Sequence, residues 1–353
     1  MSARFLLLLL VLITSGARAQ GFAGLGTDAE GFAVPEPGRE LVFPQDHGPH
    51  PNFRIEWWYL TANLKDENGA DFGLQWTLFR SALRPTAGDG WSASQTWMAH
   101  AAVTTKEDHF STERFSRGGI GQAGVNTAPF SAWIDDWQMT SQAAPGDDPF
   151  SALRVFARGP DFSYDIALTA SGSLVLHGDN GLSVKSASGQ ASYYYSQPFY
   201  TVTGTITLPS GRFEVSGRAW LDREWSSQPL DPDQTGWDWL SLHFDDGAKL
   251  MGFRLRSRSA DAYTSATWID PSGKTTAYGD GALKMTPGRM QRVAGRDVPV
   301  EWRLQLAERD LDITVTAINP LSWMETLIPY WEGPVTAEGT RGGQGYLEMT
   351  GYE

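Results

Sequence analysis

Short runs of alternating or β-branched residues dominate the chain, and helical periodicity is scarce. Gly, Asn, Asp and Pro, which favour turns, separate the runs. Three dipeptides between such runs predict hairpin turns: Asn68-Gly69, Asp246-Gly247 and Ser272-Gly273. Residues 201–225 predict two strands around a Pro-Ser-Gly turn, and residues 302–318 predict another hairpin. This spacing is typical of an all-β barrel or sandwich, with residues 321–328 as the best helix candidate.

A faint internal repeat connects the two halves of the chain. Residues 56–80 resemble residues 236–256, with a longer turn in the first copy. The aligned pairs are Trp57 with Trp237, Tyr59 with Trp239, Leu60 with Leu240 and Gly69 with Gly247. Chance similarity within a Trp-rich β protein would explain the same match. A true repeat predicts two copies of one barrel-like domain that meet near residue 205, each with room for a ligand.

The first nineteen residues have the pattern of a cleaved signal peptide. Arg4 precedes an apolar run at residues 5–13, and Ala17-Arg18-Ala19 is a small-x-small cleavage site before Gln20. A buried N-terminal helix is the alternative. We expect a periplasmic or secreted protein with a linker at residues 20–40. No later apolar run approaches the ~20 residues of a transmembrane helix, so we expect no stable membrane insertion.

The composition narrows the classes of partner and chemistry. The chain has 28 Lys and Arg against 41 Asp and Glu, a net charge of −13, which makes nucleic acid and anionic membrane surfaces poor partners. It contains no Cys and therefore no disulfide. The sequence shows no phosphate-binding Gly-rich loop, dinucleotide fingerprint or G-x-S-x-G elbow, so we expect no cofactor and no Ser-hydrolase chemistry.

Residues 220–247 combine four Trp with seven carboxylates. Side chains alternate along a strand, so Trp220, Asp222 and Glu224 share one face. The following strand places on one face Trp237, Trp239, Ser241 and His243. A carboxyl group surrounded by indole rings loses hydration, which raises its pKa and keeps it protonated near neutral pH. The pattern favours a barrel interior that holds an apolar ligand beside a few polar groups.

Six motifs, in order, resemble one known family: FPQDHGPHPNFRIEWWYLTANL, SYYYSQP, GRAWLDREW, GWDWLSLHFDDGAKLMGFRLR, PYWEGPV and GQGYLEMTGY. They resemble the secreted lipocalin-like proteins that include AttH and carotenoid 1,2-hydratase (hydroxyneurosporene synthase). The resemblance implies two consecutive calycin-like or lipocalin-like antiparallel β-barrel domains, at residues 41–205 and 206–353. It also implies an apolar ligand of isoprenoid or lipid type. For the hydratase branch it implies acid-catalysed addition of water to an isolated double bond without a cofactor.

We therefore expect one apolar ligand site that includes an acid. The match of GRAWLDREW to the family motif makes Asp222 the expected proton donor, with Glu224 as its partner. The expected ligand-binding residues are Trp220, Trp237, Trp239, His243, Tyr194 and Tyr195. Aromatic faces would stabilise the carbocation that forms when an alkene is protonated. A second carboxylate or His243 would then act as the base toward water.

Two other functions stay open. A non-enzymatic lipid carrier would need the apolar cavity but no acid facing it. A glycoside-active enzyme would place two carboxyl groups about 5–10 Å apart across an open cleft. Arg218 or Arg223 could pair with Asp222 or Glu224 in a structural ion pair, and this arrangement would favour the carrier.

Four other positions raise separate questions. His47, His50 and Glu56 together suggest a metal site, although a zinc site needs three or four well-placed ligands. We expect a hydrogen-bonded loop there and no metal. His100 lies in an apolar strand and is expected to be a core histidine.

Overall fold

The structure is a computed structural model that describes residues 29–86, 88 and 90–352. The expected signal peptide (1–19) and the first part of the expected linker (20–40) lie outside the described residues. Within those residues the regular structure is almost entirely antiparallel β-sheet, with four 3₁₀ turns: η2 (Gln45–His47), η3 (Gly90–Ser92), η4 (Pro149–Ser151) and η5 (Ala307–Arg309). No helix among these residues is long and apolar enough to cross a membrane.

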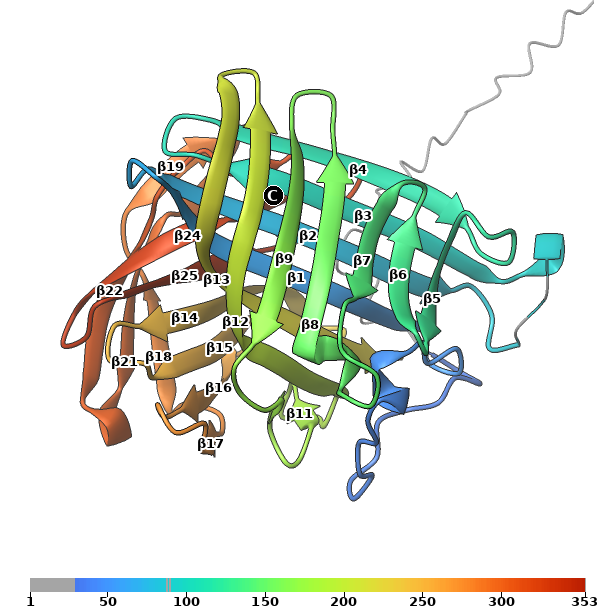
Figure 1. Ribbon diagram of the computed structural model, residues 1–353. Coiled ribbons are helices and arrows are strands. Elements are labelled where there is room, and N and C mark those ends of the chain that lie inside the picture. Colours follow the sequence, from blue (N-terminus) through green and yellow to red (C-terminus); the bar gives the residue numbers. More distant parts are fainter. Residues whose placement is uncertain (1–28, 87, 89, 353) are drawn as a thin grey trace, which may run out of the picture.

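The first sheet has 13 strands and curves into a nearly closed barrel (Figure 1). Its strands are β1 (Ile55–Asp66), β2 (Asp71–Ala82), β3 (Gln95–Thr104), β4 (His109–Arg117), β5 (Ala123–Thr127), β6 (Phe130–Ile134), β7 (Trp137–Ser141), β8 (Ala152–Arg158), β9 (Ser163–Ala170), β10 (Val175–Leu176), β11 (Leu182–Val184), β12 (Ala191–Leu208) and β13 (Gly211–Ser226). The order is β4-β3-β2-β1-β13-β12-β9-β8-β7-β6-β5, and β10 and β11 both pair with β12.

The second sheet has 10 strands and forms the other nearly closed barrel. Its strands are β14 (Gln234–Phe244), β15 (Lys249–Ser257), β16 (Tyr263–Ile269), β17 (Thr275–Tyr278), β18 (Leu283–Pro287), β21 (Glu301–Leu306), β22 (Leu311–Ala317), β23 (Trp323–Met324), β24 (Tyr330–Gly339) and β25 (Gly343–Met349). The order is β17-β16-β15-β14-β25-β24-β22-β21-β18, with β23 on β24. A separate hairpin joins β19 (Met290–Val293) to β20 (Arg296–Pro299).

The two sheets share one strand order, which gives the faint sequence repeat a structural counterpart. In the first sheet β2, β1, β13, β12 and β9 are consecutive neighbours, and in the second β15, β14, β25, β24 and β22 take the same places. β13 belongs to the first sheet, so the chain passes to the second sheet through residues 227–233. The boundary expected at 205/206 is therefore too early. The sequence indicated the turn at Pro209. It did not indicate that the strand after this turn, β13, belongs to the first sheet.

The predicted hairpin turns are present, and their glycines show why. Gly69, Gly247 and Gly273 join β1 to β2, β14 to β15 and β16 to β17, with φ angles of 82°, 89° and 88°. Other residues rarely adopt such angles. The helix candidate at 321–328 is wrong, because it contains β23. Trp323 and Met324 are buried there by pairing with β24, and this tertiary pairing outweighs the local propensity.

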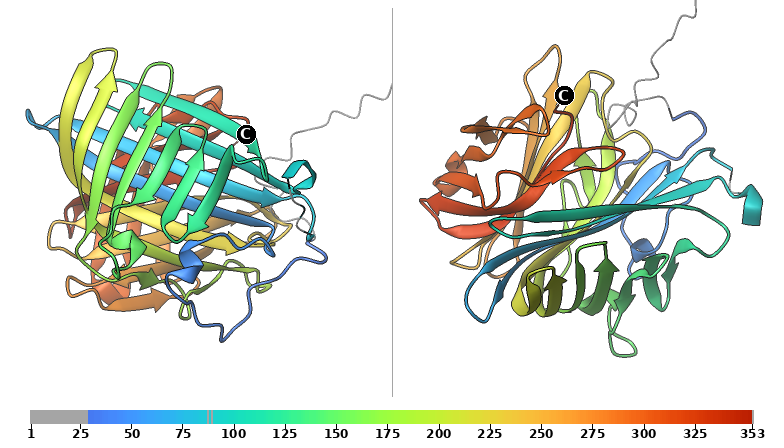
Figure 2. Two further views of the ribbon diagram at one scale, coloured as in Figure 1. Left: turned by 45° about the vertical axis from the view of Figure 1, so that its right-hand side comes forward. Right: turned by 90° about the horizontal axis from the view of Figure 1, so that it is seen from above.

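Each sheet encloses its own apolar core, and a third apolar cluster lies between the sheets. Figure 2 shows the second sheet, orange to red, packed along one side of the first. The third cluster takes residues from both sheets, among them Tyr59, Trp220, Trp239 and Phe253. The candidate site lies within this third cluster.

Candidate functional site

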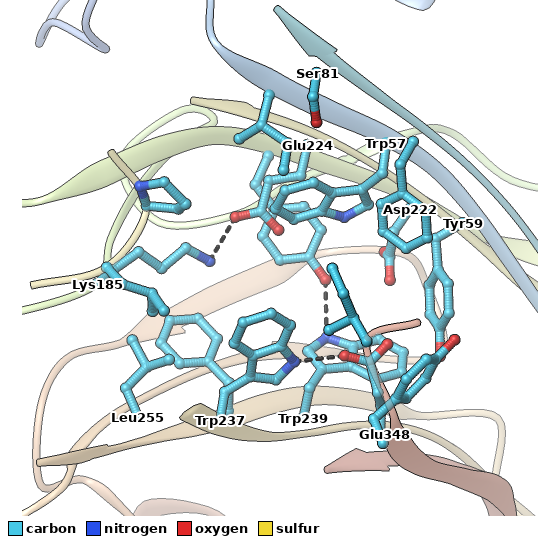
Figure 3. Close-up of a pocket in the computed structure, with 18 of the residues that line it drawn as sticks. Trp57, Tyr59, Ser81, Lys185, Asp222, Glu224, Trp237, Trp239, Leu255 and Glu348 are labelled. Carbon is cyan, nitrogen blue, oxygen red and sulfur yellow. Dashed lines mark hydrogen bonds and ion pairs between the residues drawn. The ribbon is translucent and has the colours of Figure 1, made fainter. Parts of the chain in front are cut away.

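An apolar pocket of about 200 Å³ opens within the third cluster, where the two sheets meet (Figure 3). Both sheets contribute to its walls. Its lining includes Trp57, Tyr59, Phe79, Met98, Lys185, Tyr194, Asp222, Glu224, Leu230, Trp237, Trp239, Phe253, Leu255, Tyr330 and Glu348. Aromatic and aliphatic side chains therefore surround a small number of polar groups, as in binding sites for apolar small molecules.

The sheets hold each other through reciprocal contacts around this pocket. From β1, the Tyr59 hydroxyl donates to Oε1 of Glu332 on β24 over 2.5 Å. From β14, Nε1 of Trp239 donates to the Tyr194 hydroxyl on β12 over 3.0 Å. The Tyr59 and Trp239 rings meet edge to face, with centroids 5.3 Å apart. The first strand of each repeat thus packs against the other sheet, and the pocket has a fixed frame.

Asp222 lies on β13 at the pocket wall, and its side chain is almost fully buried. Nε1 of Trp220 donates to Oδ1 of Asp222 over 2.7 Å, and the Ser196 hydroxyl donates to the same oxygen. Ser196 is itself held by Nε2 of His177 at 2.6 Å. Burial and, to a smaller extent, the charge of Glu224 raise the pKa of Asp222 to about 7, although these hydrogen bonds lower it. Asp222 is therefore substantially protonated at neutral pH.

Glu224 has a different environment, although it lines the same pocket. Nζ of Lys185 lies 2.8 Å from Oε1 of Glu224, and the Ser192 hydroxyl donates to that oxygen. The Lys185 ammonium also lies 4.2 Å from the ring centre of Phe253. Both side chains of the ion pair are nearly buried. The sequence pattern did not indicate Lys185, which follows β11 and reaches β13 only in the fold.

A further acid, Glu348, which the sequence reasoning did not select, lies on the opposite wall (Figure 3). Glu348 on β25 accepts a hydrogen bond of 2.5 Å from Nε1 of Trp237. Burial raises the pKa of Glu348 to about 7, and Glu224 contributes to the rise. Glu332 on β24 is the cross-strand neighbour of Glu348. Burial, followed by the charge of Glu348, raises the pKa of Glu332 well above its usual value.

The other predicted site residues divide into two groups. Tyr194, Trp237 and Trp239 line the pocket, and Trp220 supports Asp222 from just behind the wall. Tyr195 and His243 do not line it.

The placements of Tyr195 and His243 have simple causes. Tyr195 follows Tyr194 on the strand and so points into the first core, where its hydroxyl lies 2.7 Å from Nδ1 of His47. His243 lies farther along its strand than the pocket, with Nε2 donating to the Pro198 carbonyl over 2.9 Å. Burial lowers the pKa of His243 to about 4.

Arg223 also faces away from the pocket and does not pair with Asp222. Its guanidinium lies 3.0 Å from Oε2 of Glu56, which a second cation, Arg80, also contacts. Nδ1 of His50 lies 3.0 Å from the same Glu56 oxygen. This network has a structural role at one end of the first barrel. Within the described residues, no group of three or more His, Asp and Glu is arranged to hold a metal ion.

Two further histidines are buried in structural contacts. Nε2 of His47 lies 3.1 Å from the Asp148 carboxylate. His100 is buried with Nδ1 2.9 Å from the Tyr330 hydroxyl, and burial lowers the pKa of His100 to about 3. His100 thereby supports Tyr330, which lines the pocket, whereas His47 lies against the first core.

The chain resembles one protein family and several solved structures. The model of the AttH-like family matches residues 34–352. A crystal structure of a Nitrosomonas europaea protein, provisionally assigned as AttH, is 34% identical, with a TM-score of 0.80 over 91% of this chain and 100% of that one. No curated protein matches the sequence.

Two more distant structures share the fold. Kievitone hydratase from Nectria haematococca is 15% identical, with a TM-score of 0.68 over 90% of this chain and 95% of that one. CghA, solved with Sch210972, is also 15% identical, with a TM-score of 0.54 over 92% and 97% of the two chains. At this identity the likeness concerns the fold alone.

Proposed function

The chain belongs to the AttH-like family, and on that premise we propose that it catalyses the acid-catalysed addition of water to an alkene, or the reverse dehydration, without a cofactor. The observation that carries the proposal is Asp222, a buried carboxyl group beside an apolar pocket, whose pKa of about 7 leaves about half of it protonated at neutral pH. Protonation of an alkene requires a general acid that still holds its proton near the operating pH and lies within reach of the double bond. The hydratase among the structures that share the fold agrees with this chemistry.

The pocket walls suit the intermediate that such a protonation produces. Trp57, Tyr59 and Trp239 present aromatic rings to the pocket. Aromatic faces attract a cation by their quadrupole, an effect of about 2 kcal/mol or more when the partners are desolvated. A carbocation formed beside Asp222 would therefore be stabilised until water adds to it.

The size of the pocket limits the ligand. Its volume of about 200 Å³ is below the roughly 300–1,000 Å³ typical of sites for drug-sized ligands. We infer that the site takes a small apolar molecule, or the reacting end of a longer isoprenoid-like one. Its apolar walls do not suit a sugar. With the leader pattern at residues 1–19, we also propose export to the periplasm or the medium.

The second candidate is a lipid carrier, because the same apolar walls would hold a ligand without any reaction. One experiment separates the two functions. The protein is incubated with farnesol, squalene and kievitone in ¹⁸O-labelled water, and mass spectrometry measures label in hydrated products. Asp222→Asn should lower the rate by about 10²–10⁴-fold, the usual contribution of a general acid. It should leave binding of the neutral fluorescent probe N-phenyl-1-naphthylamine unchanged. Probe binding without product from the wild-type protein would favour the carrier.

A further inference from the structure

We propose that Glu348 is the second proton-transfer group of this pocket and the counterpart of Asp222 in the other half of the repeat. The inference rests on the proposed function and adds the base that removes a proton from water. It also assigns Glu332, the cross-strand neighbour of Glu348, as a residue that acts through Glu348 by its charge.

The strand registers show that the two acids occupy equivalent places. Asp222 pairs across the strands with Tyr59 on β1, and Glu348 pairs with Trp239 on β14. Tyr59 and Trp239 are themselves aligned residues of the repeat. On the other side, Asp222 pairs with Ser196 on β12, just as Glu348 pairs with Glu332 on β24.

The sequence supports this correspondence once the registers are known. YYSQP at residues 194–198 aligns with YWEGP at residues 330–334, so that Ser196 falls on Glu332. The dipeptide Leu221-Asp222 likewise aligns with Leu347-Glu348. Each acid thus follows a buried Leu on the strand next to the first strand of its repeat.

The titratable groups around Glu348 come from several elements. Those that face it are Glu332 on β24, Glu224 on β13, Tyr59 on β1 and Tyr330 at the start of β24. Lys185 neutralises Glu224 within an ion pair. Burial, and then the charge of Glu348, raise the pKa of Glu332 well above its usual value. Glu348 lines the pocket and Glu332 does not, so Glu348 is the acid of this cross-strand pair that can reach a ligand, and burial brings its pKa to about 7.

The resulting step balances in atoms and charge. The Asp222 carboxyl gives its proton to one alkene carbon, and the π electron pair forms the new C–H bond. The neighbouring carbon becomes cationic, the water oxygen forms a C–O bond with it, and the Glu348 carboxylate takes the water proton. Asp222 ends ionised and Glu348 protonated, and solvent exchange restores both. The reverse dehydration uses the same two groups with exchanged roles.

The test compares Glu348→Gln and Glu332→Gln with Glu338→Gln, a matched control at an exposed position of β24. Hydration of farnesol, squalene and kievitone is measured across pH, together with N-phenyl-1-naphthylamine binding. Glu348→Gln should lower turnover about 10²-fold or more while probe binding stays intact. It should also change a bell-shaped pH profile into a single limb. Glu332→Gln should lower turnover less than Glu348→Gln does and should shift the limb of the pH profile that belongs to Glu348. Glu338→Gln should match the wild type.

A second readout does not depend on turnover. Carbon NMR of the labelled Glu carboxyl groups should show Glu348 titrating near neutral pH and responding to the bound probe. Titration near the ordinary Glu value of about 4.3, or full turnover in Glu348→Gln, overturns the inference. If Asp222→Asn abolishes turnover and Glu348→Gln does not, the inference fails and the proposed function stands. Full turnover in Asp222→Asn overturns the proposed function instead.

Discussion

Replacing Asp222 with Asn should change how the stability of the fold depends on pH. The folded protein raises the pKa of this carboxyl from 3.8 to about 7. Below pH 4 the group is protonated in both the folded and the unfolded chain and contributes no difference. Between about pH 4 and pH 7 only the unfolded chain ionises, so the free energy of unfolding falls as pH rises. At about 1.36 kcal/mol per unit of pKa, the loss from this one group is about 4 kcal/mol by pH 8.

Urea denaturation at a series of pH values measures this effect. Glu332 and Glu348 also have raised pKa values, so they too lower the free energy of unfolding as pH rises. The informative quantity is therefore the difference in the free energy of unfolding between the wild type and Asp222→Asn. That difference should change by about 4 kcal/mol in favour of the variant from pH 4 to pH 8, and then level off. Glu338→Gln, at its exposed site, supplies the matched control. Parallel curves for the wild type and Asp222→Asn would refute the raised pKa and with it the role of Asp222 as proton donor.

Three further variants test the frame of the site. Lys185→Met leaves the Glu224 carboxylate buried without its cation and should lower the free energy of unfolding by about 3–5 kcal/mol; adding Glu224→Gln should recover most of this loss in urea denaturation. Glu56→Gln removes the carboxylate shared by Arg80 and Arg223 and should cost a similar ~3–5 kcal/mol, seen as a lower urea midpoint. Gly73→Ala puts a Cβ 2.6 Å from the ring of Pro334, so overpacking should cost about 1–3 kcal/mol; an unchanged melting temperature would contradict the close contact.

The features that were predictable from sequence are those set by neighbours along the chain. Glycines with positive φ fix the hairpin turns, and strand alternation puts Asp222, Glu224 and Trp239 on the faces that line the pocket. Alternation predicts which face a side chain lies on, but it does not predict how far along the strand the pocket extends. His243 shares a face with Trp239 but lies beyond the pocket, against the Pro198 carbonyl.

The features that were not predictable depend on how the sheets face each other. Glu348 is the only acid in its strand, and Glu332 shares its strand only with the exposed Glu338, so nothing in their own segments resembles an acid pair. Lys185 lies 39 positions before Glu224 and meets it only because β11 pairs with β12 beside β13. One usable signal existed. Extending the faint repeat to YYSQP and YWEGP would have brought Glu332 into consideration.

The reciprocal packing of the two sheets bears on the ancestry of this chain. Because β1 packs on β24 and β14 packs on β12, one half alone could complete such a pocket only with a second copy of itself. A symmetric dimer of that kind would carry identical acids on both walls. When both halves lie in one chain, the residues of each wall can change independently of the other. The two halves differ in this way where Ser196 is equivalent to Glu332 and where Glu224 is equivalent to Thr350.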